Sequence, residues 1–134
     1  MPSNPKTDPT GGCLCGGVTY RVTGALRPVV ACHCTQCRKS SGHYGAATQV
    51  KRAELTITET TLRWFRSSDQ AERGFCSVCG SNLFWRRPET QLISIWAGTI
   101  DGPTGLTMDR QIHVASKGDY YDLPDVPVVE QAEL

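Results

Sequence analysis

The stretch Ala31-Cys32-His33-Cys34-Thr35-Gln36-Cys37-Arg38-Lys39 places three cysteines within six positions. The chain has seven cysteines, and the other four form two pairs on either side of this stretch. Cys13 and Cys15 lie upstream, and Cys76 and Cys79 lie downstream. An odd number of thiols cannot be fully paired in disulfides. C-x-C and C-x-x-C spacings are typical of metal ligands, so the sequence predicts metal binding.

Seven sulfurs divide naturally into a group of four and a group of three. Zinc prefers four tetrahedral ligands, and a site with only three protein ligands keeps a position open for chemistry. The group of three should be the most local one: Cys32, Cys34 and Cys37. The two flanking pairs then form a closed structural site: Cys13, Cys15, Cys76 and Cys79. We therefore predict two zinc ions per chain, one structural and one catalytic.

Two other ligand arrangements remain open from the sequence. The pairs Cys34/Cys37 and Cys76/Cys79 could form a zinc ribbon, although the gap between them exceeds the roughly 15–20 residues usual for that pattern. Alternatively, a histidine could complete the three-sulfur site. The candidates are His33, His43 and His113, of which His43 is favoured. His33 lies between two predicted ligands, so in an extended segment its side chain should point away from the metal.

The rest of the sequence predicts a small all-β protein of short antiparallel strands, stabilised by zinc. Segments with alternating or apolar character occur at residues 18–22, 29–31, 44–50, 55–58, 62–66, 82–86, 92–97 and 111–115. One short helix is expected from Thr35 to Ser41, closed at Gly42. A core this thin would be reinforced by a structural metal.

Composition narrows the class of protein further. The net charge of +1 gives no reason to expect nucleic-acid binding, and no apolar run approaches the roughly 18 residues of a membrane span. Residues 1–10 lack the apolar region of a secretory signal, so we expect a cytoplasmic protein with reduced thiols. The expected organisation is a flexible arm at 1–10, a zinc domain at 11–123 and a tail at 124–134.

The cysteine pattern resembles that of the glutathione-dependent formaldehyde-activating (GFA) family, which includes centromere-protein-V-like domains. The segments that carry the resemblance are Gly12-Cys13-Leu14-Cys15-Gly16, Cys32-His33-Cys34-Thr35-Gln36-Cys37-Arg38-Lys39-Ser40-Ser41-Gly42, Arg73-Gly74-Phe75-Cys76-Ser77-Val78-Cys79-Gly80-Ser81, Gly98-Thr99-Ile100-Asp101, Ile112 and Ser116-Lys117. The resemblance runs from about Gly11 to Leu123.

This resemblance implies a β-tent fold with a structural four-cysteine zinc and a catalytic three-cysteine zinc. It also implies a carbon–sulfur lyase that adds glutathione to formaldehyde and forms S-hydroxymethylglutathione. The sequence departs from the family pattern at Gln111, where the family often has His. It also carries Tyr120 and Tyr121 in the region where a Trp commonly follows Ser-Lys.

Several residues near the cysteines are candidates for binding the substrate or supporting the site. Arg38 and Lys39 follow the last predicted ligand and could receive a carboxylate of glutathione or of another anionic thiol. The three tryptophans, Trp64, Trp85 and Trp96, are expected in the core more than in a pocket wall. Asp101 is expected to form a turn rather than to act as a base.

Our main hypothesis is a zinc-dependent lyase that acts on a small thiol and uses Cys32, Cys34 and Cys37 as its catalytic residues. The alternative hypothesis is a non-catalytic binding domain stabilised by zinc. The sequence does not identify the thiol or the aldehyde, and it leaves the oligomeric state open.

Overall fold

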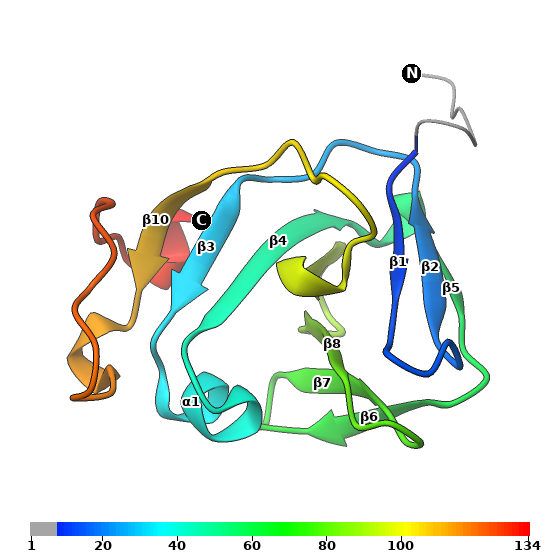
Figure 1. The fold of residues 1–134 in the computed structure, drawn as a ribbon, viewed down its shortest axis with the longest axis horizontal. Helices are drawn as coiled ribbons and strands as arrows, with labels where there is room; N and C mark the ends of the chain where they lie inside the picture. Colours follow the sequence, from blue (N-terminus) through cyan, green and yellow to red (C-terminus); the bar gives the residue numbers. More distant parts are fainter. Residues whose placement is uncertain (1–7) are drawn as a thin grey trace.

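The computed structural model describes residues 8–134 and shows two sheets (Figure 1). The smaller sheet contains β1 (Thr10–Gly12), β2 (Thr19–Val22) and β5 (Leu55–Thr58), in that order. The larger sheet has seven strands in the order β10 (Met108–Ile112), β3 (Val29–Cys32), β4 (Gly45–Lys51), β9 (Leu92–Trp96), β8 (Asn82–Arg86), β7 (Glu72–Cys76) and β6 (Leu62–Arg66). The predicted all-β class is confirmed.

Within residues 8–134, helical structure is confined to short segments. One α-helix, α1 (Thr35–Ser41), follows β3 as predicted. The remaining helical turns are of the 3₁₀ type: η1 (Arg52–Glu54), η2 (Ala97–Thr99), η3 (Val114–Ser116) and η4 (Gln131–Glu133). Among the described residues, no helix has the length and apolar character that crossing a membrane requires.

The core lies between the two sheets. Three buried residues in or next to β2 of the smaller sheet face it: Val18, Tyr20 and Val22. They pack against almost fully buried residues of the larger sheet: Val50, Leu62, Leu83, Phe84, Ile93 and Ile95. Strand β9 shows how the larger sheet divides its side chains. Ile93 and Ile95 enter the core, whereas their neighbours project to the opposite face. The larger sheet therefore has one face in the core and one face free to form a site.

Strand β10, at the edge of the larger sheet, differs from the sequence prediction in its bounds and in its pairing. The last strand was expected at 111–115, but β10 ends at Ile112 because His113 adopts a left-handed backbone with φ of 57°. β10 also pairs in parallel with β3, so one pair departs from the predicted antiparallel pattern. The start of β10 was missed because Asp109 and Arg110 are charged residues, which form an ion pair with each other at 2.9 Å.

The predicted ends of the domain are partly described. Of the expected arm at 1–10, residues 1–7 lie outside the described part, and Thr10 already belongs to β1. In the expected tail at 124–134, Val128 forms a parallel bridge with Gln111, so this segment packs beside β10. The boundaries at 10/11 and 123/124 stay predictions.

Strand β1 escaped sequence analysis because two of its three residues are glycines. Gly11 pairs with Tyr20 of β2, and a Cβ atom at Gly11 would lie 2.3 Å from the Tyr20 hydroxyl and 2.4 Å from the Thr99 carbonyl oxygen. That hydroxyl also hydrogen-bonds the Thr99 side chain at 2.8 Å. Only glycine allows this approach between β1, β2 and η2.

We predict that Gly11→Ala lowers the free energy of unfolding by about 1–3 kcal/mol, because the added methyl group overlaps backbone that cannot move freely. Urea unfolding of the metal-loaded protein measures the change. Gly98→Ala is the matched control, since a Cβ at Gly98 meets nothing within 4 Å. Equal midpoints for the two variants would contradict this account of Gly11.

Candidate metal centres and the adjoining cleft

The structure brings four cysteines from two distant segments into one cluster. The side chains of Cys13, Cys15, Cys76 and Cys79 lie within 4.8 Å of one another. Cys15 Sγ is 3.6 Å from both Cys13 Sγ and Cys76 Sγ, across 61 positions of sequence in the second case. A tetrahedral zinc with Zn–S bonds of about 2.3 Å places its sulfurs about 3.8 Å apart. The spacing fits a metal, and all seven cysteines of the chain are free.

Hydrogen-bond donors surround the sulfurs of this four-cysteine cluster. The Ser81 hydroxyl, 3.2 Å from Cys79 Sγ, and the Ser81 backbone N–H lower the pKa of the Cys79 thiol to about 5. The Cys79 backbone N–H and the Thr61 hydroxyl lower the pKa of Cys76 to about 7. Both thiols are thus prepared to bind a cation as thiolates.

Cys15 shows that the four sulfurs do not all ionise readily by themselves. A backbone N–H from Gly17 lowers the pKa of Cys15, but the neighbouring Cys13 and Cys76 sulfurs outweigh it and raise the pKa to about 11. Four thiolates so close together repel one another unless a metal ion compensates their charge.

The second cluster contains Cys32, Cys34 and Cys37, whose sulfurs also lie within 4.8 Å of one another. Cys32 ends β3, and Cys34 caps the start of α1 by accepting the Cys37 backbone N–H at 3.3 Å. Cys37 lies in the first turn of α1 and is buried. The pKa of Cys34 is lowered, first by the Cys32 thiol and then by the Cys37 thiol. The helix ends at Gly42 with a left-handed φ of 84°.

The alternative ligand sets do not form in the described residues 8–134. Cys34 and Cys37 group with Cys32 and not with Cys76 and Cys79, which excludes the zinc ribbon. No histidine of residues 8–134 joins either cluster. His43 Nδ1 hydrogen-bonds the Tyr120 hydroxyl at 2.8 Å, and His113 Nε2 bonds the Gln131 side chain at 3.0 Å.

His33 is fully buried, and both of its ring nitrogens are engaged away from the sulfurs. The Gln111 amide nitrogen donates to the carbonyl oxygens of Pro124 and Val126, each at 2.9 Å, so its oxygen accepts from His33 Nε2–H at 2.9 Å. His33 Nδ1 then accepts from the Tyr121 hydroxyl at 2.6 Å. Gln111 and Tyr121 thus hold the loop between Cys32 and Cys34 through His33.

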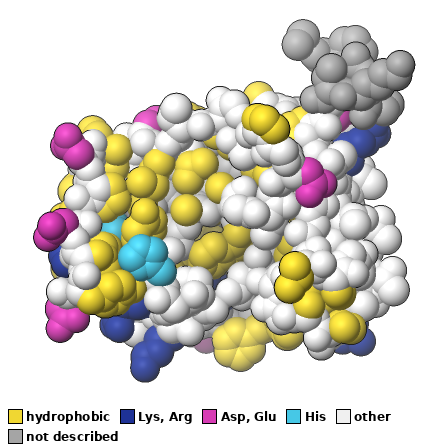
Figure 2. Space-filling model, viewed as in Figure 1, with side chains coloured by type: hydrophobic (Ala, Val, Ile, Leu, Met, Phe, Trp, Pro, Cys, Tyr) yellow, Lys and Arg dark blue, Asp and Glu magenta, His cyan; other side chains and the backbone are white. Residues whose placement is uncertain are grey.

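Aromatic rings enclose this histidine. His33 stacks on Tyr121, and Tyr44 lies 5.1 Å from its ring centre. His43 also contacts Tyr44 and Tyr121. Figure 2 shows histidine at the surface beside hydrophobic side chains, on the side of the molecule where β10 and the C-terminal segment lie in Figure 1.

A cleft of about 610 Å³ adjoins the three-cysteine cluster, on the face of the larger sheet opposite the core. Cys32, Cys34 and Cys37 all line it. The rest of the lining includes apolar residues of five neighbouring strands: Val30, Ala47, Trp85, Leu92, Trp96 and Ile112. Volumes of about 300–1,000 Å³ are usual for small-molecule sites. None of the four cysteines of the other cluster is among its lining residues within 8–134.

Some residues that line the cleft were not predicted to lie there. Trp85 and Trp96 lie in its wall, whereas the core was favoured for them; Trp64 packs on buried Phe84. Arg73 was quoted only as part of a motif, yet its guanidinium lies 3.7 Å from Cys37 Sγ. Sequence spacing gave no signal for this contact, because Arg73 and Cys37 lie 36 positions apart in the sequence.

Two predicted substrate-binding residues lie outside the cleft lining. Arg38 is half-buried and Lys39 is exposed, both on α1 behind the third cysteine. Neither is among the residues that line the cleft within 8–134. A role for Arg38 and Lys39 in binding a thiol stays a prediction. Asp101 accepts a hydrogen bond from Thr10 at 3.0 Å and is exposed.

Comparison with known proteins identifies the family. Residues 8–116 match the family model of the glutathione-dependent formaldehyde-activating enzyme, GFA. This match covers most of the chain, and the protein belongs to the GFA family.

Individual relatives agree with this assignment. An uncharacterized lyase of Schizosaccharomyces pombe is 28% identical over 116 residues, which cover 84% of this chain and 82% of that protein. A candidate glutathione-dependent formaldehyde-activating enzyme of Halomonas elongata is 29% identical over 124 residues, which cover 84% and 79%. A crystal structure of a Rhodobacter sphaeroides protein is similar with a TM-score of 0.61, at 20% identity, over 90% of this chain and 99% of that one. This last likeness shows the fold.

We predict that Gln111→Leu lowers the free energy of unfolding by about 2–4 kcal/mol. The buried His33 N–H and the Val126 carbonyl oxygen would lose this partner, and the Pro124 carbonyl oxygen would keep only the Val126 N–H. Each unsatisfied buried group costs about 1–3 kcal/mol. Chemical denaturation of the metal-loaded protein tests this. Gln91→Leu, at an exposed loop position, is the control. If both variants unfolded at the same denaturant concentration, the hydrogen-bond network would have no stabilising role.

Proposed function

We propose that this protein is a zinc-dependent carbon–sulfur lyase of the GFA type, which forms or cleaves an adduct between a small thiol and an aldehyde. S-hydroxymethylglutathione is the model adduct. In the forward direction, the thiol sulfur bonds to the aldehyde carbon, and the proton of the thiol ends on the former carbonyl oxygen. No oxidant or reductant is consumed.

The observation that carries this proposal is the unequal placement of the two cysteine clusters. Cys32, Cys34 and Cys37 face a cleft of small-molecule size, whereas the four-cysteine cluster can satisfy zinc without any further ligand. Four thiolates fill all coordination positions of a zinc ion and make it electron-rich. Three thiolates leave its fourth coordination position open. A zinc ion held by the three cysteines would supply a Lewis acid that lowers the pKa of a thiol bound beside it.

The chain's own residues would hold the three sulfurs in place and shape the reaction space. The N-terminal turn of α1 fixes Cys34 and Cys37, and the His33–Gln111 hydrogen bond fixes the loop between the first two cysteines. Arg73 donates toward Cys37 Sγ from the cleft side. The apolar walls at Trp85 and Trp96 limit water around a bound thiol and aldehyde.

In this proposal, Cys13, Cys15, Cys76 and Cys79 hold the structural zinc. The smaller sheet and the turn after β7 would then be joined by metal–sulfur bonds. The proposal requires a reducing compartment such as the cytoplasm, because oxidation of the open three-thiolate site would abolish metal binding.

We predict different outcomes for one cysteine substitution in each cluster. Cys34→Ser should keep the fold, reduce bound zinc from two ions to about one per chain and lower turnover about a hundredfold or more, because even outer partners of a metal ligand are worth 10–100-fold. Cys76→Ser should prevent stable folding, because the structural ion is lost. Elemental analysis, circular dichroism and a thiol–aldehyde turnover assay measure the three effects.

These measurements also decide between the lyase and a non-catalytic binding domain. A wild-type protein that holds two zinc ions but forms no adduct with glutathione, cysteine or other common thiols would reject the lyase and leave the binding domain. Loss of the fold in Cys34→Ser would reject the assignment of separate roles to the clusters.

A further inference from the structure

The C-terminal residues form one end of the cleft wall. Gln131 and Leu134, in and just after the turn η4, are both among the residues that line the cleft. In Figure 1 this turn is coloured red and lies beside β10. Both positions lie beyond residue 116, where the match to the family model ends. This end of the wall is therefore outside the matched family region.

The chain just before this turn is firmly attached to β10 through one residue. Gln111 donates from its side-chain nitrogen to the carbonyl oxygens of Pro124 and Val126, each at 2.9 Å. Its backbone N–H donates to the Pro127 carbonyl oxygen, and its own carbonyl oxygen accepts from the Val129 N–H, both at 2.9 Å. Gln111 is almost fully buried, so water does not compete for these four bonds. This part of the chain therefore stays in place.

Residues 130–134 are held to the rest of the protein much more weakly. Among the described residues, one hydrogen bond joins them to the remainder of the chain, between His113 Nε2 and the Gln131 side-chain oxygen at 3.0 Å. The other hydrogen bonds of this segment lie within its own turn. An exposed hydrogen bond contributes little net stability, because water can replace either partner. The segment can thus detach while the residues before it stay bound to β10.

His113 reaches the cleft because of its backbone conformation. Ile112, the last residue of β10, also lines the cleft, and successive residues of a strand point to opposite faces. A regular strand would therefore turn His113 away. Its left-handed φ of 57°, which no other non-glycine residue of the described chain shares with a positive value, brings both side chains to the cleft. Such a conformation persists only where its surroundings require it, so His113 is a fixed point to which Gln131 attaches.

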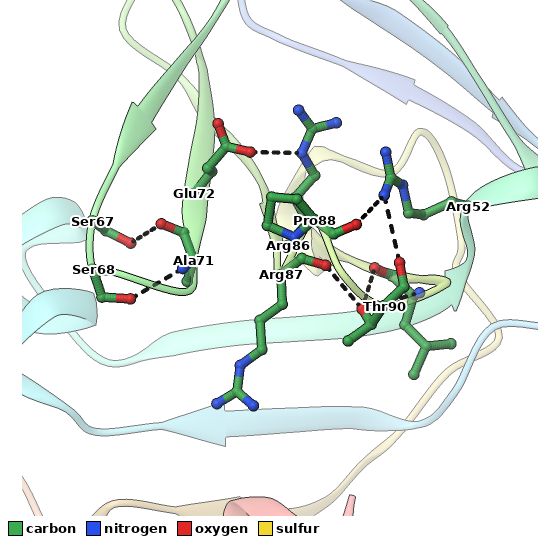
Figure 3. Close-up of polar contacts among 10 residues, drawn as sticks. Arg52, Ser67, Ser68, Ala71, Glu72, Arg86, Arg87, Pro88 and Thr90 are labelled. Atoms are coloured by element: carbon green, nitrogen blue, oxygen red, sulfur yellow. Dashed lines mark hydrogen bonds and ion pairs between the residues drawn. The ribbon is translucent and has the colours of Figure 1, made fainter.

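The cleft wall on the side of β7 and β8 is held by several hydrogen bonds (Figure 3). In the turn before β7, the Ser68 hydroxyl accepts from the Ala71 N–H at 3.1 Å. In the turn after β8, Thr90 donates to the Arg87 carbonyl oxygen from its N–H at 2.9 Å and from its hydroxyl at 3.0 Å. Arg52 donates in turn to the Thr90 carbonyl oxygen at 3.4 Å. Since β7 and β8 lie far from β10 in the sheet order, the cleft has one firm side and one weakly held side.

We propose that residues 130–134 form a hinged cover over one end of the cleft, and that Gln131 and Leu134 determine how large a ligand can reach the three cysteines. The hinge lies at Val129, the last residue bound to β10. Small ligands enter while the cover is closed, and bulky ligands enter only after the His113–Gln131 hydrogen bond breaks. The inference rests on the proposed function only in that both place the ligand in this cleft.

Alkylation of the zinc-loaded protein by two reagents of different size tests the cover without relying on turnover. N-methylmaleimide and N-(1-pyrenyl)maleimide are both neutral and carry the same reactive group, so they differ mainly in bulk. Peptide mass spectrometry gives the initial rate at each cysteine. Deletion of residues 130–134 should raise the rate of the pyrenyl reagent at Cys32, Cys34 and Cys37 at least about tenfold, because this reagent reacts only with the open fraction of the full chain. The rate of the methyl reagent should change less than about twofold, because it enters the closed cleft.

A single substitution assigns the effect to the contact that closes the cover. Gln131→Ala removes the hydrogen bond to His113 and should raise the rate of the pyrenyl reagent at the three cysteines about two- to tenfold. Glu133→Ala is the matched control, because Glu133 lies in the same turn, is exposed and is outside the cleft lining. The four cysteines of the other cluster serve as an internal reference, and their rates should be the same in every variant. Zinc content and circular dichroism verify each protein.

The outcomes separate this inference from the proposed function. Equal pyrenyl rates at the three cysteines in the full chain and the deletion variant, or an equal rise for both reagents, would overturn the cover. If the deletion also exposes the four-cysteine cluster, the fold is lost, and the comparison of Gln131→Ala with Glu133→Ala decides instead. A size-dependent rise in a protein that forms no thiol–aldehyde adduct would reject the lyase and keep the cover. Adduct formation without any size-dependent rise would keep the lyase and overturn the cover.

Discussion

The convergence of four sulfurs from two distant segments is the constraint on which the remaining structure depends. Cys13 and Cys15 precede β2, and Cys76 and Cys79 lie around the turn after β7. These segments belong to different sheets, so their meeting fixes how the two sheets face each other. Cys76 is also a member of the core. The four-cysteine cluster and the hydrophobic core are therefore one unit, as expected for a small domain with a thin interior.

Strand β7 relates this cluster to the cleft. It ends at Cys76, in the four-cysteine cluster, and begins near Arg73, which contacts the three-cysteine cluster. The two residues are separated by roughly 10 Å of extended backbone. Any displacement of the four-cysteine cluster would therefore move the Arg73 guanidinium, which lies beside the three-cysteine cluster. Strand β7 thus connects the four-cysteine cluster to the wall of the cleft, although none of the four cysteines lines that cleft within residues 8–134.

The sequence predicted those features that depend on local pattern. The division of the cysteines followed from their spacing. A short helix at 35–41, closed at Gly42, was expected because it brings Cys37 back beside Cys32 and Cys34. The strands 55–58, 62–66 and 82–86 were predicted at their observed positions because their residues are apolar or alternate.

Features that depend on contacts distant in sequence were not predictable. The charged start of β10 forms a strand because it pairs with β3, not because of its own composition. The cleft-side positions of Trp85, Trp96 and Arg73 depend on which face of a curved sheet is covered, and no local pattern encodes that. The Gln111–His33 hydrogen bond joins positions 78 residues apart.

The two-faced sheet has a consequence for how this protein could acquire new specificities. Along β9, the core residues Ile93 and Ile95 alternate with the cleft residues Leu92, Ser94 and Trp96. Substitutions at the second set would reshape the cavity while leaving hydrophobic packing intact. Stability and ligand choice are thus assigned to interleaved positions of a single strand, which lets selection or a protein engineer vary one while holding the other constant.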